Sequence, residues 1–197
     1  MSIYREHVNR LVNFLSQPEN IVTKRKNQIV TLDAEKNVLI LHQGIISSCR
    51  ASDDRLLANF SAPRHFGINL FLDPSMLYFR ACTDISYETM SLSEAEKTLD
   101  TQNLWKDVSI NQMLTISQML KYVNNMAGVT SYAQVIHCLY QLESEPDIIR
   151  LHRTAADYTV DKSGLSRSTV MKLVAQFKAE KKLTLRKGLL VELKNLE

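Results

Sequence analysis

The chain has 197 residues, of which 45% are hydrophobic and 23% are charged, and its formal net charge is +3. This composition is that of a globular protein with enough apolar residues for a core, and it excludes a fibrous or intrinsically disordered chain. No apolar run reaches the roughly 20 residues of a membrane-spanning helix, and the charged N-terminus does not resemble a signal peptide. We therefore expect a cytoplasmic protein without membrane contact.

The positive charge is concentrated near the C-terminus. From Arg150 to Glu197 the sequence has 11 Lys and Arg against 5 Asp and Glu, whereas the residues before them have 13 against 16. A basic module at one end of a mildly acidic chain is typical of proteins that bind a polyanion such as DNA.

The first predicted elements are one helix and a series of strands. Apolar residues recur at helical spacing over residues 4–15, which predicts an amphipathic helix there. Short β-rich segments separated by turn signals follow: QIVTL (28–32), VLILHQ (38–43), IISSCR (45–50), RLLANF (55–60), LYFRACT (77–83) and ISYETM (85–90). Six or more short strands at this spacing favour an antiparallel roll or barrel.

Two helices are predicted next. Ser93 and Glu96 have the spacing of a capping box and should begin a short helix. A long helix over residues 104–127 ends at Gly128, and its apolar stripe is wider than packing against one neighbour requires. One edge of the stripe can cover the roll. The other edge has 3-4-3 spacing and predicts a seam between two copies of the chain, formed by Ile116, Met119, Val123 and Met126. The alternative is a core helix packed wholly within one chain.

The C-terminal part contains the most informative stretch, SGLSRSTVMKLVAQF at 163–177, which follows a predicted helix at 132–142 and an acidic linker at 143–147. Gly164 and Leu165 should form a tight turn, after which Ser166 occupies the N-cap position of a helix. One face of that helix is apolar, with Val170, Leu173, Val174 and Phe177. The opposite face has Arg167, Ser168, Met171, Lys172 and Lys178. By itself this pattern also fits an ordinary amphipathic helix with solvated charges.

The segment KLTLRKGLLVEL at 182–193 predicts a hairpin whose turn is Arg186-Lys187-Gly188. Helix, turn, helix and hairpin together form a winged helix-turn-helix, in which the second helix can enter the major groove of DNA. We therefore expect an α+β fold with three parts: a β-roll at 1–103, a long dimerisation helix at 104–128 and a winged helix-turn-helix at 129–197.

This order of parts resembles the cyclic-AMP receptor protein (Crp/Fnr) family of bacterial transcription regulators over nearly the whole chain. LHQGIISSC is similar to the family's strand–glycine–strand pattern, HFGINLF to the opening of its phosphate cassette, YFRACT to the following strand and SGLSRSTV to its helix-turn-helix core. Within the family, QNLWKD, NNMAGVTSYAQV and SRSTV look most similar to the enterobacterial branch named for inhibition of hydrogen peroxide resistance, a stress response.

The chain departs from the family pattern where cyclic nucleotides bind. Members that bind a nucleotide have a Glu after the cassette glycine for the ribose and an Arg for the cyclic phosphate. Here Gly67 is followed by Ile68 and Asn69, and Ser75 occupies the position of the Arg. Neither isoleucine nor serine can supply the charged pair, so the resemblance implies a degenerate pocket and no cofactor. The family's iron–sulfur branch needs clustered N-terminal cysteines, which this sequence lacks.

The resemblance also implies DNA contacts. The family's base-reading positions fall on Arg167, Ser168 and Lys172. The phosphate-contacting candidates are Ser166, Thr169, Lys178 and Lys187. One departure lies in the preceding helix, where Thr159 and Val160 replace an apolar residue followed by a small one, which suggests a shifted or loosened helix. The implied partners are a palindromic double-stranded operator, a second copy of the chain and RNA polymerase.

Other chemistry is not indicated. The five histidines have no metal-ligand spacing, and no phosphate loop or nucleophile elbow is present, so we expect neither an enzyme nor a metal protein. Cys49, Cys82 and Cys138 are far apart and should be reduced thiols, with a redox sensor as the alternative. The favoured function is a homodimeric, sequence-specific transcription regulator independent of cyclic nucleotide. The rival function is a ligand-binding or protein-interaction module whose winged helix contacts a protein.

Overall fold

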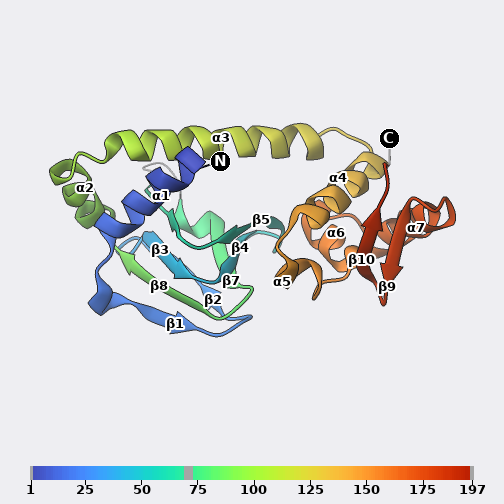
Figure 1. Cartoon of the computed structure of the whole chain (residues 1–197), viewed down its shortest axis with the longest axis horizontal. Coiled ribbons are helices and arrows are strands. Elements are labelled where there is room, and N and C mark those ends of the chain that lie inside the picture. Colours follow the sequence, from blue (N-terminus) through green and yellow to red (C-terminus); the bar gives the residue numbers. More distant parts are fainter. Residues whose placement is uncertain (1, 69–72, 196–197) are drawn as a thin grey trace. The chain divides into compact units, whose positions relative to one another are not determined.

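The computed structural model describes residues 2–68 and 73–195, which form two compact units, Met1–Gln118 and Met119–Glu197. The division between the units falls within one long helix, α3 (Trp105–Met126). The first unit contains two antiparallel sheets with helices beside them, and the second contains helices and a hairpin (Figure 1). The predicted α+β class is confirmed, with an antiparallel roll followed by a winged helix-turn-helix.

The strands of the roll form two four-stranded sheets. The first sheet has the order β1 (Val22–Lys24), β8 (Ile85–Met90), β3 (Val38–Gln43) and β6 (Arg64–Phe66). The second has the order β2 (Ile29–Val30), β7 (Leu77–Ala81), β4 (Ile45–Arg50) and β5 (Leu56–Ser61). Every neighbouring pair is antiparallel. The sequence predicted all of these strands except β1 (VTK) and β6 (RHF), which contain no apolar run of their own.

Two apolar clusters hold the roll together. The first lies between the sheets and contains Val30, Leu39, Leu41, Ile46, Phe79, Ala81, Ile85 and Tyr87. In the second, Val38 and Ile40 on the opposite face of β3 pack against α1 (Ser2–Leu15), α2 (Leu92–Thr101) and the start of α3. The first four residues of β3 are therefore buried on both faces, which is why that strand reads as an unbroken apolar run.

The beginning of α3 is tied to α1 by a buried carboxylate. Asp107 of α3 lies 2.7 Å from His7 Nδ1 and 3.4 Å from Arg10 Nη1, and its own side chain is buried. Leu104 and Val108 beside it belong to the apolar cluster under α1. This end of α3 is thus a fixed part of the first unit, as the wide apolar stripe predicted.

The predicted capping box at the start of α2 is placed two residues too late. Ser91, not Ser93, is the N-cap: its Oγ accepts from Glu94 N at 3.2 Å, and its own N–H donates to Glu94 Oε2 at 2.9 Å. Strand β8 ends at Met90, so the extended backbone of an N-cap falls on Ser91.

This assignment gives a simple stability test. Ser91→Ala removes the cap and should lower the free energy of unfolding by about 1 kcal/mol. Ser93→Ala is the matched control, since Ser93 is exposed within the same turn, and it should change the stability by less than about 0.5 kcal/mol. Denaturant unfolding followed by the fluorescence of Trp105, the single tryptophan, measures both variants. Equal losses in the two variants would show that Ser91 does not cap α2.

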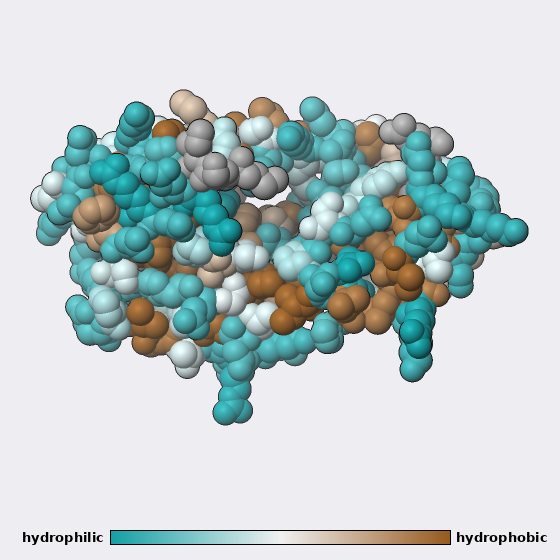
Figure 2. Space-filling model, in the orientation of Figure 1, coloured by the Kyte–Doolittle hydropathy of each residue, from teal (hydrophilic) through white to brown (hydrophobic). Residues whose placement is uncertain are grey.

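Along the rest of α3 an apolar stripe is exposed in the single chain. It consists of Met113, Ile116, Met119, Leu120 and Val123, each more than half exposed. Hydrophobic side chains are visible among hydrophilic ones at the edge where α3 runs (Figures 1 and 2). Met126, which was expected in the seam, is only 8% exposed. It is not part of the exposed stripe, and at this end of α3 a residue of α4 is close by: Gln134 Nε2 donates to Met126 O at 2.8 Å.

The second unit contains α4 (Ser131–Ser144), α5 (Asp147–Arg150), α6 (Ala155–Ser163), α7 (Arg167–Ala179), β9 (Leu183–Arg186) and β10 (Leu189–Leu193). Its α6 packs against both α4 and α7, and α7 packs against β9. The segment expected to be a linker at 143–147 instead holds the end of α4 and the start of α5, with Pro146 between them.

No helix within the described residues is long and apolar enough to cross a membrane. In the same residues, His, Cys, Asp and Glu side chains form no group of three that could hold a metal ion. Cys49 and Cys138 are buried, and burial raises the pKa of the Cys138 thiol to about 12. Cys82 is partly exposed, with its Sγ 2.9 Å from Ser47 Oγ.

Candidate nucleic-acid interface

The predicted recognition helix is α7. Ser166 is its N-cap, with an Oγ that accepts from Thr169 N at 3.2 Å. Val170, Val174 and Phe177 are buried, so the apolar face predicted from the sequence is the face that packs on the rest of the unit. Phe177 also meets Tyr132 of α4 edge to face, with the ring centroids 5.2 Å apart. These contacts fix α7 by one side and leave the other side open.

The open side carries the residues expected to contact DNA. Arg167, Ser168 and Lys172 are exposed, as is Lys178 at the last turn. Thr169 is half-buried, and its hydroxyl lies 2.8 Å from Ser166 Oγ. Lys178 follows Arg167 by three helical turns and so lies on nearly the same side of α7. Arg167, Ser168, Lys172 and Lys178 are therefore accessible on α7, whereas Thr169 lies nearly opposite Lys178 around the helix.

The helix before the turn, α6, is regular and not loosened. It begins at the N-cap Thr154 and ends at Gly164, whose φ of 71° is in the left-handed region that favours glycine. Thr159 occupies a fully buried position on it, and Ser163 Oγ donates to Thr159 O at 2.6 Å. Among the described residues the buried Thr159 hydroxyl has no hydrogen-bond partner, and α6 is nevertheless a continuous helix from Ala155 to Ser163.

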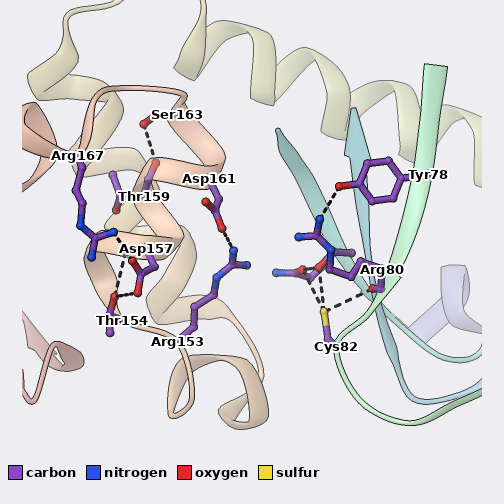
Figure 3. A network of polar contacts seen from close by, with 12 residues as sticks. Tyr78, Arg80, Cys82, Arg153, Thr154, Asp157, Thr159, Asp161, Ser163 and Arg167 are labelled. Atoms are coloured by element: carbon purple, nitrogen blue, oxygen red, sulfur yellow. Dashed lines mark hydrogen bonds and ion pairs between the residues drawn. The ribbon is translucent and has the colours of Figure 1, made fainter. Parts of the chain in front are cut away.

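An acidic residue of α6 contacts the first residue of α7. Arg167 Nη1 donates to Asp157 Oδ1 at 2.6 Å, and the Thr154 hydroxyl donates to Asp157 Oδ2 at 2.6 Å (Figure 3). The hydrogen bond from Thr154 lowers the pKa of Asp157 most, and the hydrogen bond from Arg167 lowers it further. Asp157 was not among the predicted site residues, although Thr154 and Asp157 have capping-box spacing.

The wing is the hairpin of β9 and β10. Its two-residue loop, Lys187 and Gly188, has positive φ at both positions, 51° and 82°, as expected for a tight hairpin turn. Gly188 O accepts from Ala155 N at 2.9 Å, which fastens the loop to the start of α6. The Lys187 side chain is exposed. The loop therefore presents a cation from a fixed position beside the helix-turn-helix.

One basic residue of this region does not face solvent. Lys162 is 3% exposed, and its ammonium lies 6.0 Å and 5.9 Å from the ring centroids of Tyr122 and Tyr158. Burial lowers the pKa of Lys162. The Lys162 ammonium therefore lies beside aromatic rings inside the unit, where a DNA phosphate cannot reach it.

The comparisons with known proteins agree with this geometry. Residues 131–197 match the family model described as winged helix-turn-helix DNA binding. The c-di-GMP-responsive global regulator CLP of Xanthomonas campestris has a similar structure, with a TM-score of 0.74 and 15% identity over 97% of this chain and 99% of that one. FixK2 of Bradyrhizobium japonicum gives a TM-score of 0.62 with 18% identity over 89% and 92% of the two chains.

A third similar structure is a CRP/FNR-family transcriptional regulator from Thermus thermophilus, with a TM-score of 0.65 and 15% identity over 87% of this chain and 93% of that one. The chain has the Crp/Fnr fold. Curated protein sequences give no significant match.

The structure also shows where the residues expected to form a degenerate nucleotide pocket lie. Gly67 has a φ of +87°, and a Cβ there would lie 1.8 Å from Asn37 O, so the position requires glycine. Ile68 is 4% exposed and belongs to the apolar cluster under α1. Ser75 is exposed on a short 3-10 turn, and Asn69 lies outside the described residues.

Arg80, the arginine nearest to Ser75 in sequence, does not point into the interior between the two sheets. Its neighbours Phe79 and Ala81 fill the interior between the sheets, so Arg80 is on the other face of β7. There its Nη2 donates to Tyr78 Oη at 2.7 Å. None of the described pocket residues offers a positive charge to a cyclic phosphate.

Proposed function

We propose that the chain is a homodimeric, sequence-specific transcription regulator that binds DNA without a cyclic nucleotide. The observation that carries the proposal is the open side of α7, where Arg167, Ser168 and Lys172 are exposed on a helix fixed by its apolar face. A helix held in this way can place its first turns against base edges in the major groove. Lys187 on the wing and Lys178 on α7 are placed to contact phosphates.

The exposed stripe on α3 supports the dimeric part of the proposal. Apolar side chains that remain exposed along one side of a helix are typical of an interface. Met113, Ile116, Leu120 and Val123 follow one another at 3-4-3 spacing, which is the pattern of a two-helix seam. A two-fold dimer would present two α7 helices to half-sites about 34 Å apart.

Independence from cyclic nucleotides rests on the pocket. Ile68 faces the apolar cluster, and Ser75 has no charge, so the family's two nucleotide-binding side chains have no counterpart at these positions. The Xanthomonas regulator is described as responsive to c-di-GMP, so this nucleotide belongs in the test beside cyclic AMP and cyclic GMP. Membership of the peroxide-resistance branch, a cytoplasmic location and contact with RNA polymerase stay predictions.

The test is a selection of binding sites from a random pool of DNA duplexes, followed by titration in 50–200 mM salt. A protein with 6–10 phosphate contacts loses on the order of 10³–10⁵ in affinity over this range. We expect a palindromic site, a steep salt dependence and the same affinity with or without each of the three nucleotides. A shallow salt dependence and no selected sequence would favour the rival function, in which the winged helix contacts a protein.

Single substitutions should separate base reading from phosphate contact. Arg167→Ala should cost about 1–3 kcal/mol on the selected site and much less on scrambled duplexes, because a guanidinium can bind one guanine edge with two hydrogen bonds. Lys178→Ala and Lys187→Ala should weaken all duplexes alike and reduce the salt slope by about one each. If Arg167→Ala lowers both affinities equally, Arg167 contacts phosphate and not a base.

A further inference from the structure

Asp157 has an unusual position for an acidic residue near a surface that is expected to meet DNA. Its carboxylate belongs to α6, yet it accepts a hydrogen bond of 2.6 Å from the first residue of α7, Arg167. The two side chains are 42% and 64% exposed, so the pair is accessible and not part of the core. A carboxylate here repels phosphate. Its presence therefore needs another reason.

The N-cap residue of α6, Thr154, holds the Asp157 carboxylate in place. The Thr154 hydroxyl donates to Asp157 Oδ2 at 2.6 Å, and Asp157 N donates to Thr154 Oγ1 at 3.0 Å, which completes a cap at the start of α6. Both carboxylate oxygens are thus used, one by the cap and one by Arg167. Asp157 is ionised at neutral pH, as an ordinary aspartate is, and these hydrogen bonds lower its pKa further.

The cap is in turn held by the wing. Gly188 O accepts from Ala155 N at 2.9 Å, and a Cβ at Gly188 would lie 3.1 Å from Thr154 Cγ2. A continuous series of contacts therefore runs from the wing loop through Thr154 and Asp157 to Arg167. Figure 3 shows its last part, in which Arg167 reaches across to Asp157 above Thr154.

Arg167 still has the donors that a guanine needs. Asp157 is bonded to Nη1, while the planar guanidinium has five N–H donors in a fixed fork. A long arginine side chain loses rotamer freedom when it is ordered on a base, and an arginine that is already held loses less. The bond to Asp157 also restricts which direction the remaining N–H groups face.

We infer that Asp157 is a positioning residue for base recognition, which orients Arg167 so that it discriminates guanine from the other bases. The inference rests on the proposed DNA-binding function and adds a specificity determinant outside the recognition helix. It predicts that Asp157 contributes to the ratio of specific to non-specific affinity, and not to affinity in general.

Asp157→Asn tests this, because asparagine keeps an oxygen for the Thr154 hydroxyl but loses the charge that holds Arg167. On the selected duplex the ratio of specific to scrambled affinity should fall about 10-fold, while the scrambled affinity stays equal or rises. Asp161→Asn is the matched control. It removes a carboxylate from the same helix, and Asp161 is paired with Arg153 and not with Arg167. It should leave the ratio unchanged.

A modified base gives a second readout that a purely structural role would not change. Replacing the guanine read by Arg167 with 7-deazaguanine removes the N7 acceptor, and this should cost the wild type about 10-fold but Asp157→Asn less than about 2-fold.

Two results would overturn the inference. Unchanged discrimination in Asp157→Asn would reduce Asp157 to a helix cap. A higher specific affinity with full discrimination would make it a latch that hides Arg167. If the wild type binds no duplex at all, the proposed function itself fails, and that failure is seen before any variant is made.

Discussion

The double variant Ile116→Glu/Val123→Glu is expected to be a monomer at micromolar concentration, and its affinity for the selected operator should fall by on the order of 100-fold or more. Loss of the dimer removes the second half-site contact, and linkage of two binding modules contributes about 10²–10⁴ to avidity. Analytical ultracentrifugation measures the first result and a mobility-shift titration the second.

The substitutions should affect assembly and not the fold of the single chain. Ile116 and Val123 are 56% and 51% exposed, so a glutamate there is solvated in the monomer. Glutamate also has a higher helix propensity than either β-branched residue. Across a two-fold axis, however, four carboxylates would be brought together in a low-dielectric seam, where like charges repel strongly.

The matched control is Gln118→Glu/Asn125→Glu. It adds the same charge at the same seven-residue spacing, at two exposed positions on the opposite side of α3. The control should remain dimeric and keep its operator affinity. A wild-type chain that is already monomeric at micromolar concentration would show that the exposed stripe is not a dimer seam.

The strands show what sequence pattern can and cannot predict. The bounds of β3, β4 and β8 follow from the sequence because each is a β-rich segment with mostly buried residues between turn signals. The positions of β1 and β6 do not, since three residues give no periodicity and their pairing with β8 and β3 comes from distant parts of the chain. The sequence pattern therefore predicted the strands that contain their own apolar run. It missed the two strands that are recognised only by their pairing with β8 and β3.

Two errors at helix ends have a similar cause. Ser91 and Ser93 both precede a glutamate by three residues, so spacing alone cannot decide which one caps α2. Met126 fits the 3-4-3 spacing of the seam, but it is buried at the end of α3, where Gln134 of α4 donates to its backbone carbonyl. In both cases the outcome depends on a neighbouring element, which is β8 for the cap and α4 for Met126. The residue pattern of one helix carries no information about its neighbours.

The interface was predicted in part. The N-cap Ser166, the buried face of α7 and the wing loop follow from turn chemistry and apolar spacing, and the structure confirms them. The hydrogen bond between Asp157 and Arg167 joins residues ten positions apart across a turn, and no sequence pattern predicts it. A capping-box search would have found Thr154 and Asp157, but only the packing of α6 on α7 shows which arginine the carboxylate meets.

The free energy of unfolding of the first unit is expected to fall by about 3 kcal/mol between pH 6.5 and pH 4 because of His65 alone. His65 of β6 is buried, and its Nε2 lies 2.8 Å from Asn111 Nδ2 of α3. The amide nitrogen can only donate, so the neutral ring accepts. Protonation would place two donors against each other inside the core.

Burial and then the nearby Arg64 charge lower the pKa of His65 from 6.5 to about 4. Above pH 6.5 the ring is neutral in both the folded and the unfolded chain, so its contribution does not change. Between pH 6.5 and 4 the unfolded chain binds a proton that the folded chain does not, and stability falls by up to about 1.4 kcal/mol per pH unit. Below pH 4 both states are protonated, and the contribution levels off.

His65→Gln removes this titration and keeps an acceptor for Asn111. The variant need not match the wild-type stability at pH 7, because the test is the difference between the two pH profiles. Denaturant titrations followed by Trp105 fluorescence should show a wild-type decline that is about 3 kcal/mol larger than that of His65→Gln over this range. His152→Gln, at an exposed histidine, should keep the wild-type profile. Parallel profiles for wild type and His65→Gln would mean that β6 opens and solvates His65 before the unit unfolds, and that the bond to Asn111 does not fasten β6 to α3.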